Sequence, residues 1–130
     1  MDETNTLDPA AIERLRKLGG DKFAADMIEL FLNYGGKKVA ETRASWQAGN
    51  LAGVAGAAHA LKSSAGNVGA EQVRKLAAQA EESAKNGLGE AAAADVTALE
   101  CAFATVRPRL EAERARLQTG ALQDSASDVG

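Results

Sequence analysis

The sequence predicts an all-α protein, an antiparallel four-helix bundle with a short additional helix at its N-terminal end. Of its 130 residues, 45% are hydrophobic and only 4% aromatic, so the core must consist mostly of small aliphatic side chains, which favours closely packed helices. Apolar residues recur at helical spacings of three and four, and no stretch alternates as a half-buried strand does. We expect one domain over residues 1–118, with its core at about 21–117, and a flexible polar tail over 119–130.

The N-terminal half contains two predicted helices. Asp8 and Pro9 have the residue types of an N-cap and a first helical position, and the short helix that follows should end at Gly19-Gly20. The second helix begins near Asp21 and runs to about residue 48, with a break or kink at Gly35-Gly36. Its apolar residues are assigned mainly to the core, with one aromatic side chain allowed at an exposed edge; they are Phe23, Met27, Leu30, Phe31, Tyr34 and Trp46.

The C-terminal half contains three further predicted helices. Asn50 is a suitable N-cap for a helix that ends at Gly66 and Gly69, and two more helices run from about residue 70 to Asn86-Gly87 and from about Glu90. The last one keeps its apolar register across Pro108, which predicts a kink there and not an end. The first of the three has the spacing of a bundle seam, through Val54, Ala58, Leu61, Ala65 and Val68. Burial is also expected for Val73, Leu76, Ala77, Ala80, Val96, Leu99, Phe103, Val106, Leu110 and Leu117.

Charge and composition exclude several classes of protein. The formal net charge is −3, and without a basic stripe carrying aromatic residues we expect no binding to nucleic acid. Cys101 is the only cysteine, so it cannot form an intramolecular disulfide, and it is interpreted as a small buried hydrophobe in a reduced compartment. The N-terminus lacks the features of a signal peptide, and the uncharged stretch 44–61 is too polar to span a membrane. We therefore expect a cytoplasmic protein. The polar tail favours a free-standing chain over part of a larger hybrid kinase, and the sequence does not decide between the two.

His59, the only histidine, lies in unusual surroundings. It follows the seam residue Ala58 by one position, about 100° around the helix, so it belongs to the flank of the buried stripe. Its flank carries small residues, including glycines that each lower helix stability by roughly 1 kcal/mol, whereas Lys62 lies one turn away. A neutral imidazole is a nucleophile near neutral pH, and a phosphoryl group on it would need a cation such as Lys62.

The stretch HALKSSAGNVG, residues 59–69, resembles the signature of histidine-containing phosphotransfer (HPt) domains. The order of the elements before it is also similar, and the resemblance covers about Asp21 to Leu117. It implies a phosphorelay intermediate: His59 accepts a phosphoryl group from a receiver-domain aspartate and passes it to another response regulator. Lys62 would stabilise the phosphate, and the partner would dock on the small residues Ala55, Gly56, Ser63 and Gly66.

The resemblance also implies which partners and cofactors the protein has and whether it is an enzyme. The protein would be a monomer, and its partners would be receiver domains of a hybrid sensor kinase or of response regulators. No cofactor is expected, and Mg²⁺ would belong only to the partner receiver. The protein would be a carrier rather than a true enzyme, without ATP-dependent kinase activity, because the glycine-containing stretches lack the lysine and the strand context of a nucleotide loop.

Two positions depart from the family pattern. Ser63 stands where the family commonly has glycine, and it is small enough to leave the approach open. Glu81 stands 22 positions after His59, where the family often has glutamine. An anion cannot donate to a phosphate, so that role does not carry over, and Glu81 is expected instead to orient Lys62 or the imidazole N–H.

Other interpretations remain beside the phosphorelay carrier. The same bundle would serve as a non-catalytic adaptor or phosphate sink that docks on receiver domains, or the motif would be a coincidence in an unrelated bundle with an ordinary surface histidine. A metal site would need more ligands than one histidine. A catalytic pair of Cys101 with His59 has no supporting motif. Transfer of phosphate from a phosphorylated receiver separates the carrier from the others.

Overall fold

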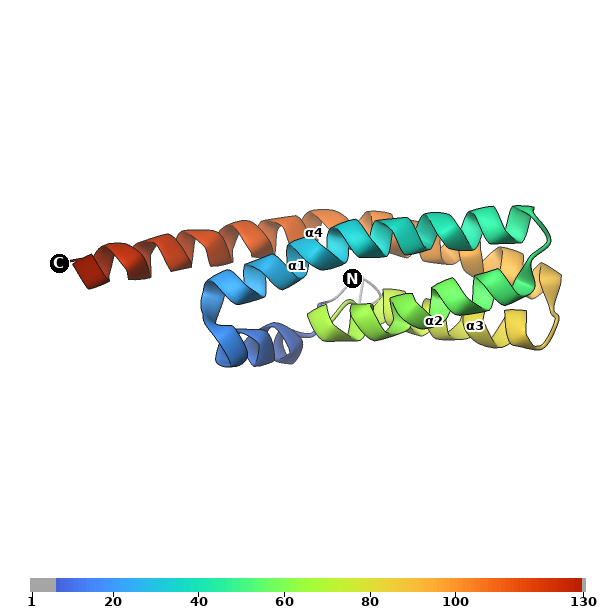
Figure 1. The fold of residues 1–130 in the computed structure, drawn as a ribbon, viewed down its shortest axis with the longest axis horizontal. Helices are drawn as coiled ribbons and strands as arrows, with labels where there is room; N and C mark the ends of the chain where they lie inside the picture. The colour runs from blue at the N-terminus through green and yellow to red at the C-terminus, as the bar shows by residue number, and fades with distance from the viewer. Residues whose placement is uncertain (1–6, 130) are drawn as a thin grey trace, which may run out of the picture.

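The computed structural model describes the backbone of residues 7–129 and the side chains of residues 7–120. Four helices follow one another in the chain: α1 (Pro9–Gln47), α2 (Leu51–Val68), α3 (Glu71–Lys85) and α4 (Gly89–Val129). Each of α1 and α3 packs against both α2 and α4, which gives a four-helix bundle (Figure 1). The predicted all-α fold is confirmed. Over the described residues, none of these helices is long and apolar enough to cross a bilayer.

The predicted short N-terminal helix is the first part of α1. Asp8 caps it, accepting a hydrogen bond from the backbone N–H of Ala10 at 3.0 Å, and Pro9 follows at the first position. The helical course is interrupted at Gly20, whose φ of 89° lies in the region that favours glycine. The chain turns sharply there, and the short segment folds back against one end of the bundle (Figure 1). The predicted boundary at Gly19-Gly20 is confirmed.

The expected break at Gly35-Gly36 is wrong, because α1 continues through both residues. The reason for a glycine at position 35 is close packing: a Cβ there would lie 3.0 Å from Cε2 of Phe103 in α4. Phe31 and Phe103 meet beside it with ring centroids 5.7 Å apart. Gly35 therefore gives two aromatic rings room between α1 and α4, and its backbone remains helical.

The start and the seam of α2 agree with the sequence, but of the two glycines expected to end it only Gly69 does so, because Gly66 lies within the helix. The side chain of Asn50 accepts a hydrogen bond from the N–H of Gly53 at 2.9 Å, and the helix ends on Gly69, which has a φ of 77°. The residues of the predicted seam are at most 1% exposed; they are Val54, Ala58, Leu61, Ala65 and Val68. The seam of α2 therefore packs into the core as predicted.

The burial predicted for α3 and α4 is confirmed except at Leu76 and Cys101. Leu76 is only partly buried against the core. Cys101, interpreted as buried, is exposed, because it follows the buried Leu99 by two residues and so lies about 200° around α4. In α1 the side chains of Leu30 and Tyr34 are 56% and 40% exposed, since they lie beyond the surface that the neighbouring helices cover. Phe23 is similarly exposed, at 36%, and Trp46 is half-buried, whereas Phe31 is in the core.

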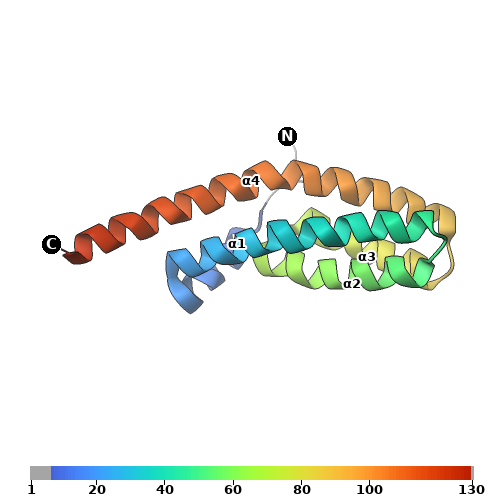
Figure 2. The same ribbon diagram turned by 45° about the horizontal axis from the view of Figure 1, so that its top comes forward.

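Helix α4 continues across Pro108, as the apolar register predicts. Figure 2 shows the axis of α4 changing direction part-way along the helix. The backbone stays helical to Val129 and projects beyond the other helices (Figures 1 and 2), whereas a polar tail was predicted from residue 119. Residue 130 lies outside the described residues, and the domain boundary at residue 118 stays a prediction.

The two adjacent glycines of α1 provide a matched test of close packing. Gly36→Ala should raise the free energy of unfolding by up to about 1 kcal/mol, because alanine is the better helix former and its Cβ would have no tight contact: the end of the Arg107 side chain would lie at 3.4 Å and the Phe103 ring at 3.8 Å. The free energy of unfolding of Gly35→Ala should be about 1–3 kcal/mol lower than that of Gly36→Ala, because the Cβ at position 35 would lie only 3.0 Å from the Phe103 ring. Urea denaturation of both variants measures the difference. Equal stability of the two would contradict the packing account.

Candidate functional site

Helix α2 brings His59 to the surface of the bundle. Its neighbour Ala58 is fully buried, and the step of about 100° per residue turns the next side chain outward. The imidazole side chain of His59 is 63% exposed. Because Asn50, Gly69 and the buried seam hold both ends and one face of α2, the exposed ring is attached to a rigid element.

Helix α3 supplies a carboxylate directly beside this ring. Glu81 is only 7% exposed, and its Oε2 lies 2.8 Å from Nδ1 of His59. Its other oxygen, Oε1, accepts a hydrogen bond from Nζ of Lys62 at 2.7 Å. Nζ of Lys85 lies 3.0 Å from Oε2. One buried carboxylate therefore joins the histidine and two lysines, and it ties α2 to α3. We call these four residues the His59 cluster.

The cluster keeps Glu81 ionised. Its pKa is lowered from 4.5 to about 2, first by the hydrogen bond from Lys62, then by that from Lys85, and to a smaller extent by that from His59; burial opposes the shift. At neutral pH the two ammonium groups and the one carboxylate sum to one positive charge beside the imidazole ring. The sequence left open whether Glu81 orients Lys62 or the imidazole N–H, and in the structure it contacts both side chains.

The small residues predicted for docking lie in different environments. Gly56 is exposed, with open space around the position of a Cβ, and Ser63 is exposed as well. Gly66 is half-buried, with Cδ of Arg74 3.5 Å from the position of its Cβ. Ala55, expected on the docking surface, is only 8% exposed because it packs between α2 and α3. With Gly56, Ala84 and Lys85 it lines a shallow hollow that opens beside His59.

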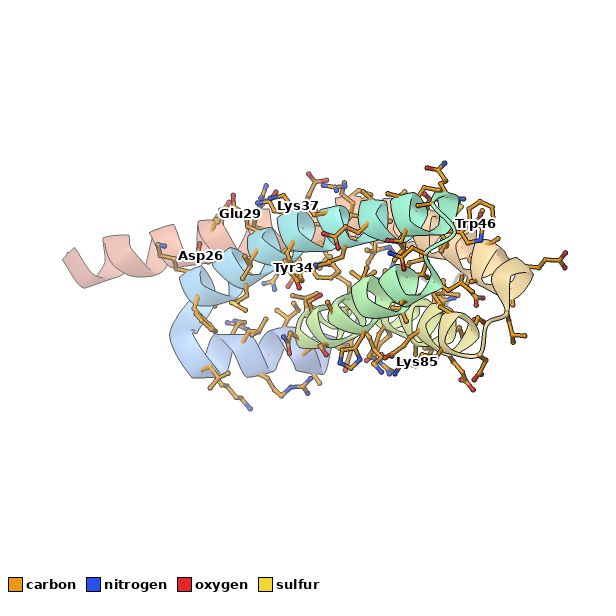
Figure 3. The ribbon with its side chains drawn as sticks, turned by 45° about the vertical axis from the view of Figure 1, so that its right-hand side comes forward. Asp26, Glu29, Tyr34, Lys37, Trp46 and Lys85 are labelled. Carbon is orange, nitrogen blue, oxygen red and sulfur yellow. The ribbon has the colours of Figure 1, made fainter. Side chains whose placement is uncertain are left out.

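Sequence reasoning missed an apolar groove on the other side of α2. It has a volume of about 220 Å³ between α1 and α2, and it is lined by Met27, Leu30, Phe31, Tyr34, Ser64, Asn67 and Val68. Figure 3 shows Tyr34 of α1 and Lys85 of α3 on either side of α2. The spacing of four between Leu30 and Tyr34 is a signal that could have placed them together on one flank of α1, but only the packed bundle shows that this flank stays uncovered.

Lys85 was also missed, although it follows Glu81 by four residues, a spacing that allows an ion pair on one helix face. A catalytic pair of Cys101 with His59, the alternative that no motif supports, is also excluded by the fold. Both side chains are exposed, and they lie on α4 and α2, which are diagonal in the bundle. Among the described residues no group of three or more histidine, cysteine, aspartate or glutamate side chains is arranged to hold a metal ion.

A comparison of the sequence with models of protein families gives a match that includes the His59 cluster. The model of the Hpt domain matches residues 26–125, which is most of the chain and includes α2, α3 and the His59 cluster. The chain belongs to the Hpt domain family. Histidine phosphotransfer in a phosphorelay is accordingly the role of this Hpt protein.

The fold of this Hpt protein has a close counterpart among solved structures. The crystal structure of histidine-containing phosphotransfer protein B (HptB) from Pseudomonas aeruginosa PAO1 is similar, with a TM-score of 0.80 and 27% sequence identity. The match covers 85% of this chain and 95% of HptB. No curated protein sequence matches the chain.

The ionised Glu81 should make the stability of the domain depend on pH. Because its pKa is lower in the folded protein, its contribution is present above pH 4.5 and is lost as the pH falls toward about 2. Glu81→Gln removes this contribution, on the order of 2 kcal/mol. Urea denaturation across the acid range should show wild type more stable than Glu81→Gln near neutral pH and the gap closing on acidification. A gap that stays constant with pH would mean that Glu81 is not held ionised by its partners.

Proposed function

We propose that His59 is the residue that carries the phosphoryl group, accepting it from the aspartyl phosphate of one receiver domain and passing it to the aspartate of another. The observation that supports this most is the exposed imidazole, which lies on the outer face of α2 while its Nδ1 is held by Glu81. An exposed ring on a rigid helix can meet the active site of a second protein without a change of fold.

Lys62 and Lys85 provide the charge that such a transfer needs. Phosphoryl transfer passes through a loose transition state whose charge lies on three oxygens, so catalysis depends on positioning and electrostatics. Lys62 lies one turn from His59, and its side chain is 35% exposed, so its ammonium group can turn from Glu81 to the phosphoryl oxygens. Mg²⁺, where the reaction requires it, is supplied by the receiver domain.

The groove between α1 and α2 offers a place for the receiver to bind beside His59. Ser63 and Asn67 follow His59 at intervals of four, so one flank of α2 leads from the imidazole to the groove wall at Asn67. On the far wall Leu30 and Tyr34 are exposed apolar side chains. We propose that an apolar side chain of the receiver enters this groove while its acidic active site faces the positively charged His59 cluster, since complementary charge orients such encounters.

His59→Gln tests the assignment of the acceptor directly. The variant should take no label from a phosphorylated receiver domain, because the amide lacks a nucleophilic ring nitrogen, and its circular dichroism should match wild type because position 59 is exposed. Acid-labile label in the wild type, measured in single-turnover transfer, is the reference. Label at the wild-type level in His59→Gln would identify another acceptor, and receiver binding without transfer to wild type would identify an adaptor.

Gly56→Gln tests the requirement for free space beside the ring. No atom outside its own helix backbone lies within 4 Å of the Cβ position, so the variant should fold and gain about 1 kcal/mol of stability. Its side chain would keep the partner away, and transfer should slow about tenfold, which corresponds to ~1.4 kcal/mol. Ala104→Gln, at an exposed position on α4, is the matched control. Equal rates for the two variants would place the docking surface elsewhere.

A further inference from the structure

Arg74 of α3 lies across the outer face of α2, at a position where α2 has no side chain. Its Cδ is 3.5 Å from the place that a Cβ of Gly66 would occupy. Gly66 follows His59 by seven residues, which is two turns, so it points in nearly the same direction about 10 Å further along the helix axis. The side chain of Arg74 is therefore part of the surface that surrounds the imidazole.

The register of α3 explains why Arg74 reaches this surface. Helices α2 and α3 pack against each other (Figure 1), and Glu81 of α3 contacts His59. Arg74 precedes Glu81 by seven residues and Lys85 follows it by four, spacings that place all three on one side of α3. Lys75 is exposed as well, but the step of about 100° per residue turns it in a different direction.

The guanidinium group of Arg74 is only partly used by contacts within the protein. Its Nε donates a hydrogen bond to Oε2 of Glu71, one turn earlier in α3, at 2.5 Å. Within the part of the chain that the structure describes, its terminal nitrogens Nη1 and Nη2 have no hydrogen-bond partner. The side chain is 41% exposed. Glu71 thus holds the group in place, while its outer edge can bind a second carboxylate through two parallel hydrogen bonds.

We propose that Arg74 is a docking residue that binds an acidic side chain of the receiver domain outside the site of phosphoryl transfer, and that it favours receivers with a carboxylate at that place. This inference rests on the proposed function, in which the receiver covers His59. Arg74 belongs neither to the His59 cluster nor to the groove between α1 and α2. It therefore acts on the affinity and the choice of receiver and not on the chemical step.

The size of a stable interface brings Arg74 under the receiver. A specific protein complex buries about 800 Å² on each partner, which is a patch roughly 30 Å across. A patch of this size centred on His59 includes Gly66, about 10 Å away along α2, and the Arg74 side chain that lies on it. At this distance from the centre, complementary charge contributes mainly to the rate and the selectivity of association.

The charges along the boundary of α2 and α3 favour an acidic partner. Lys62 and Lys85 leave the His59 cluster with one net positive charge, and Arg74 places a further cation at the other end of the same side of α3. Glu71 offsets this charge on one edge of the guanidinium only, because it bonds Nε. A receiver whose acidic surface extends beyond its phosphorylated aspartate would meet positive groups along this whole boundary.

Equilibrium binding tests the proposal without any phosphoryl transfer. The probe is a receiver domain that binds the wild-type protein, and every variant is made in His59→Gln, which cannot be loaded. Arg74→Gln should raise Kd about five- to tenfold, whereas its Cδ still covers Gly66. Arg74→Lys should recover part of the affinity, since it keeps the charge without the fork. Lys75→Gln, the matched control, removes the same charge from the next exposed position and should leave Kd unchanged.

Charge reversal identifies the chemistry of the partner group. Arg74→Glu should weaken binding more than Arg74→Gln, because the new carboxylate repels the receiver's acidic side chain. Exposed carboxylates around the active site of the receiver are then changed to lysine one at a time. One of these receiver variants should restore binding to Arg74→Glu. If none restores it, the partner of Arg74 is not a carboxylate and the proposal is overturned.

Single-turnover transfer from the phosphorylated receiver separates docking from chemistry, in proteins that retain His59. Arg74→Gln should raise the half-saturating receiver concentration about five- to tenfold and leave the maximal rate within about twofold of wild type. Added salt should reduce the difference. Circular dichroism and urea denaturation should match wild type, because an exposed ion pair such as that of Arg74 with Glu71 contributes little to stability.

The outcomes distinguish this inference from the proposed function. If Arg74→Gln and Lys75→Gln weaken binding equally, the effect is one of overall charge and the inference is overturned. A lower maximal rate with an unchanged half-saturating concentration also overturns it, because Arg74 would then act on the chemical step. If the receiver binds wild type without labelling it, the assignment of His59 fails, whereas the comparison of Kd values still decides the role of Arg74. Weaker binding for Arg74→Gln alone, partly restored in Arg74→Lys, supports the inference.

Discussion

The buried carboxylate of Glu81 is the constraint on which the functional site depends. A carboxylate that is 7% exposed is unfavourable between two helices unless cationic or hydrogen-bonding partners surround it. Here Lys62 and His59 from α2 and Lys85 from α3 provide those partners. The same contacts that make its burial tolerable fix the ring of His59 and keep both lysines beside it. Stability of the α2–α3 contact and geometry of the site therefore cannot be altered independently.

Small side chains make this arrangement possible. The seam of α2 and the facing side of α3 are rich in alanine, so the two helices approach closely and a glutamate side chain spans the distance to α2. On the other side of the bundle, Gly35 leaves room for Phe31 and Phe103 to meet between α1 and α4. Aromatic packing thus fixes one pair of helices, while the pair that bears the site is packed by small residues and joined by charged groups.

The exposed face of α2 combines two kinds of surface. Toward α3 it offers a positively charged cluster beside the imidazole, and toward α1 it borders an apolar groove with Leu30 and Tyr34 at the surface. A partner that contacts both surfaces is held in orientation over His59, because apolar burial contributes affinity whereas charge contributes orientation and rate. Such a surface suits a carrier that must release one receiver before it meets the next.

The sequence by itself determined the fold class, the order of the helices, the caps at Asp8 and Asn50, the seam of α2 and the outward position of His59. These features depend on periodicity and on local hydrogen bonds, which a single chain segment contains. Tertiary packing decided the rest. Gly35-Gly36 was expected to be a break because glycine weakens an isolated helix, but Phe103, 68 positions away in the chain, accounts for the glycine at 35. Cys101, Leu30 and Tyr34 are exposed because the faces that carry them have no helix against them. The bond between Glu81 and His59 joins residues on two helices, and a helix pattern gives neither the distance nor the rotation between neighbours, so only the packed bundle shows which atom of the ring is held and which is free.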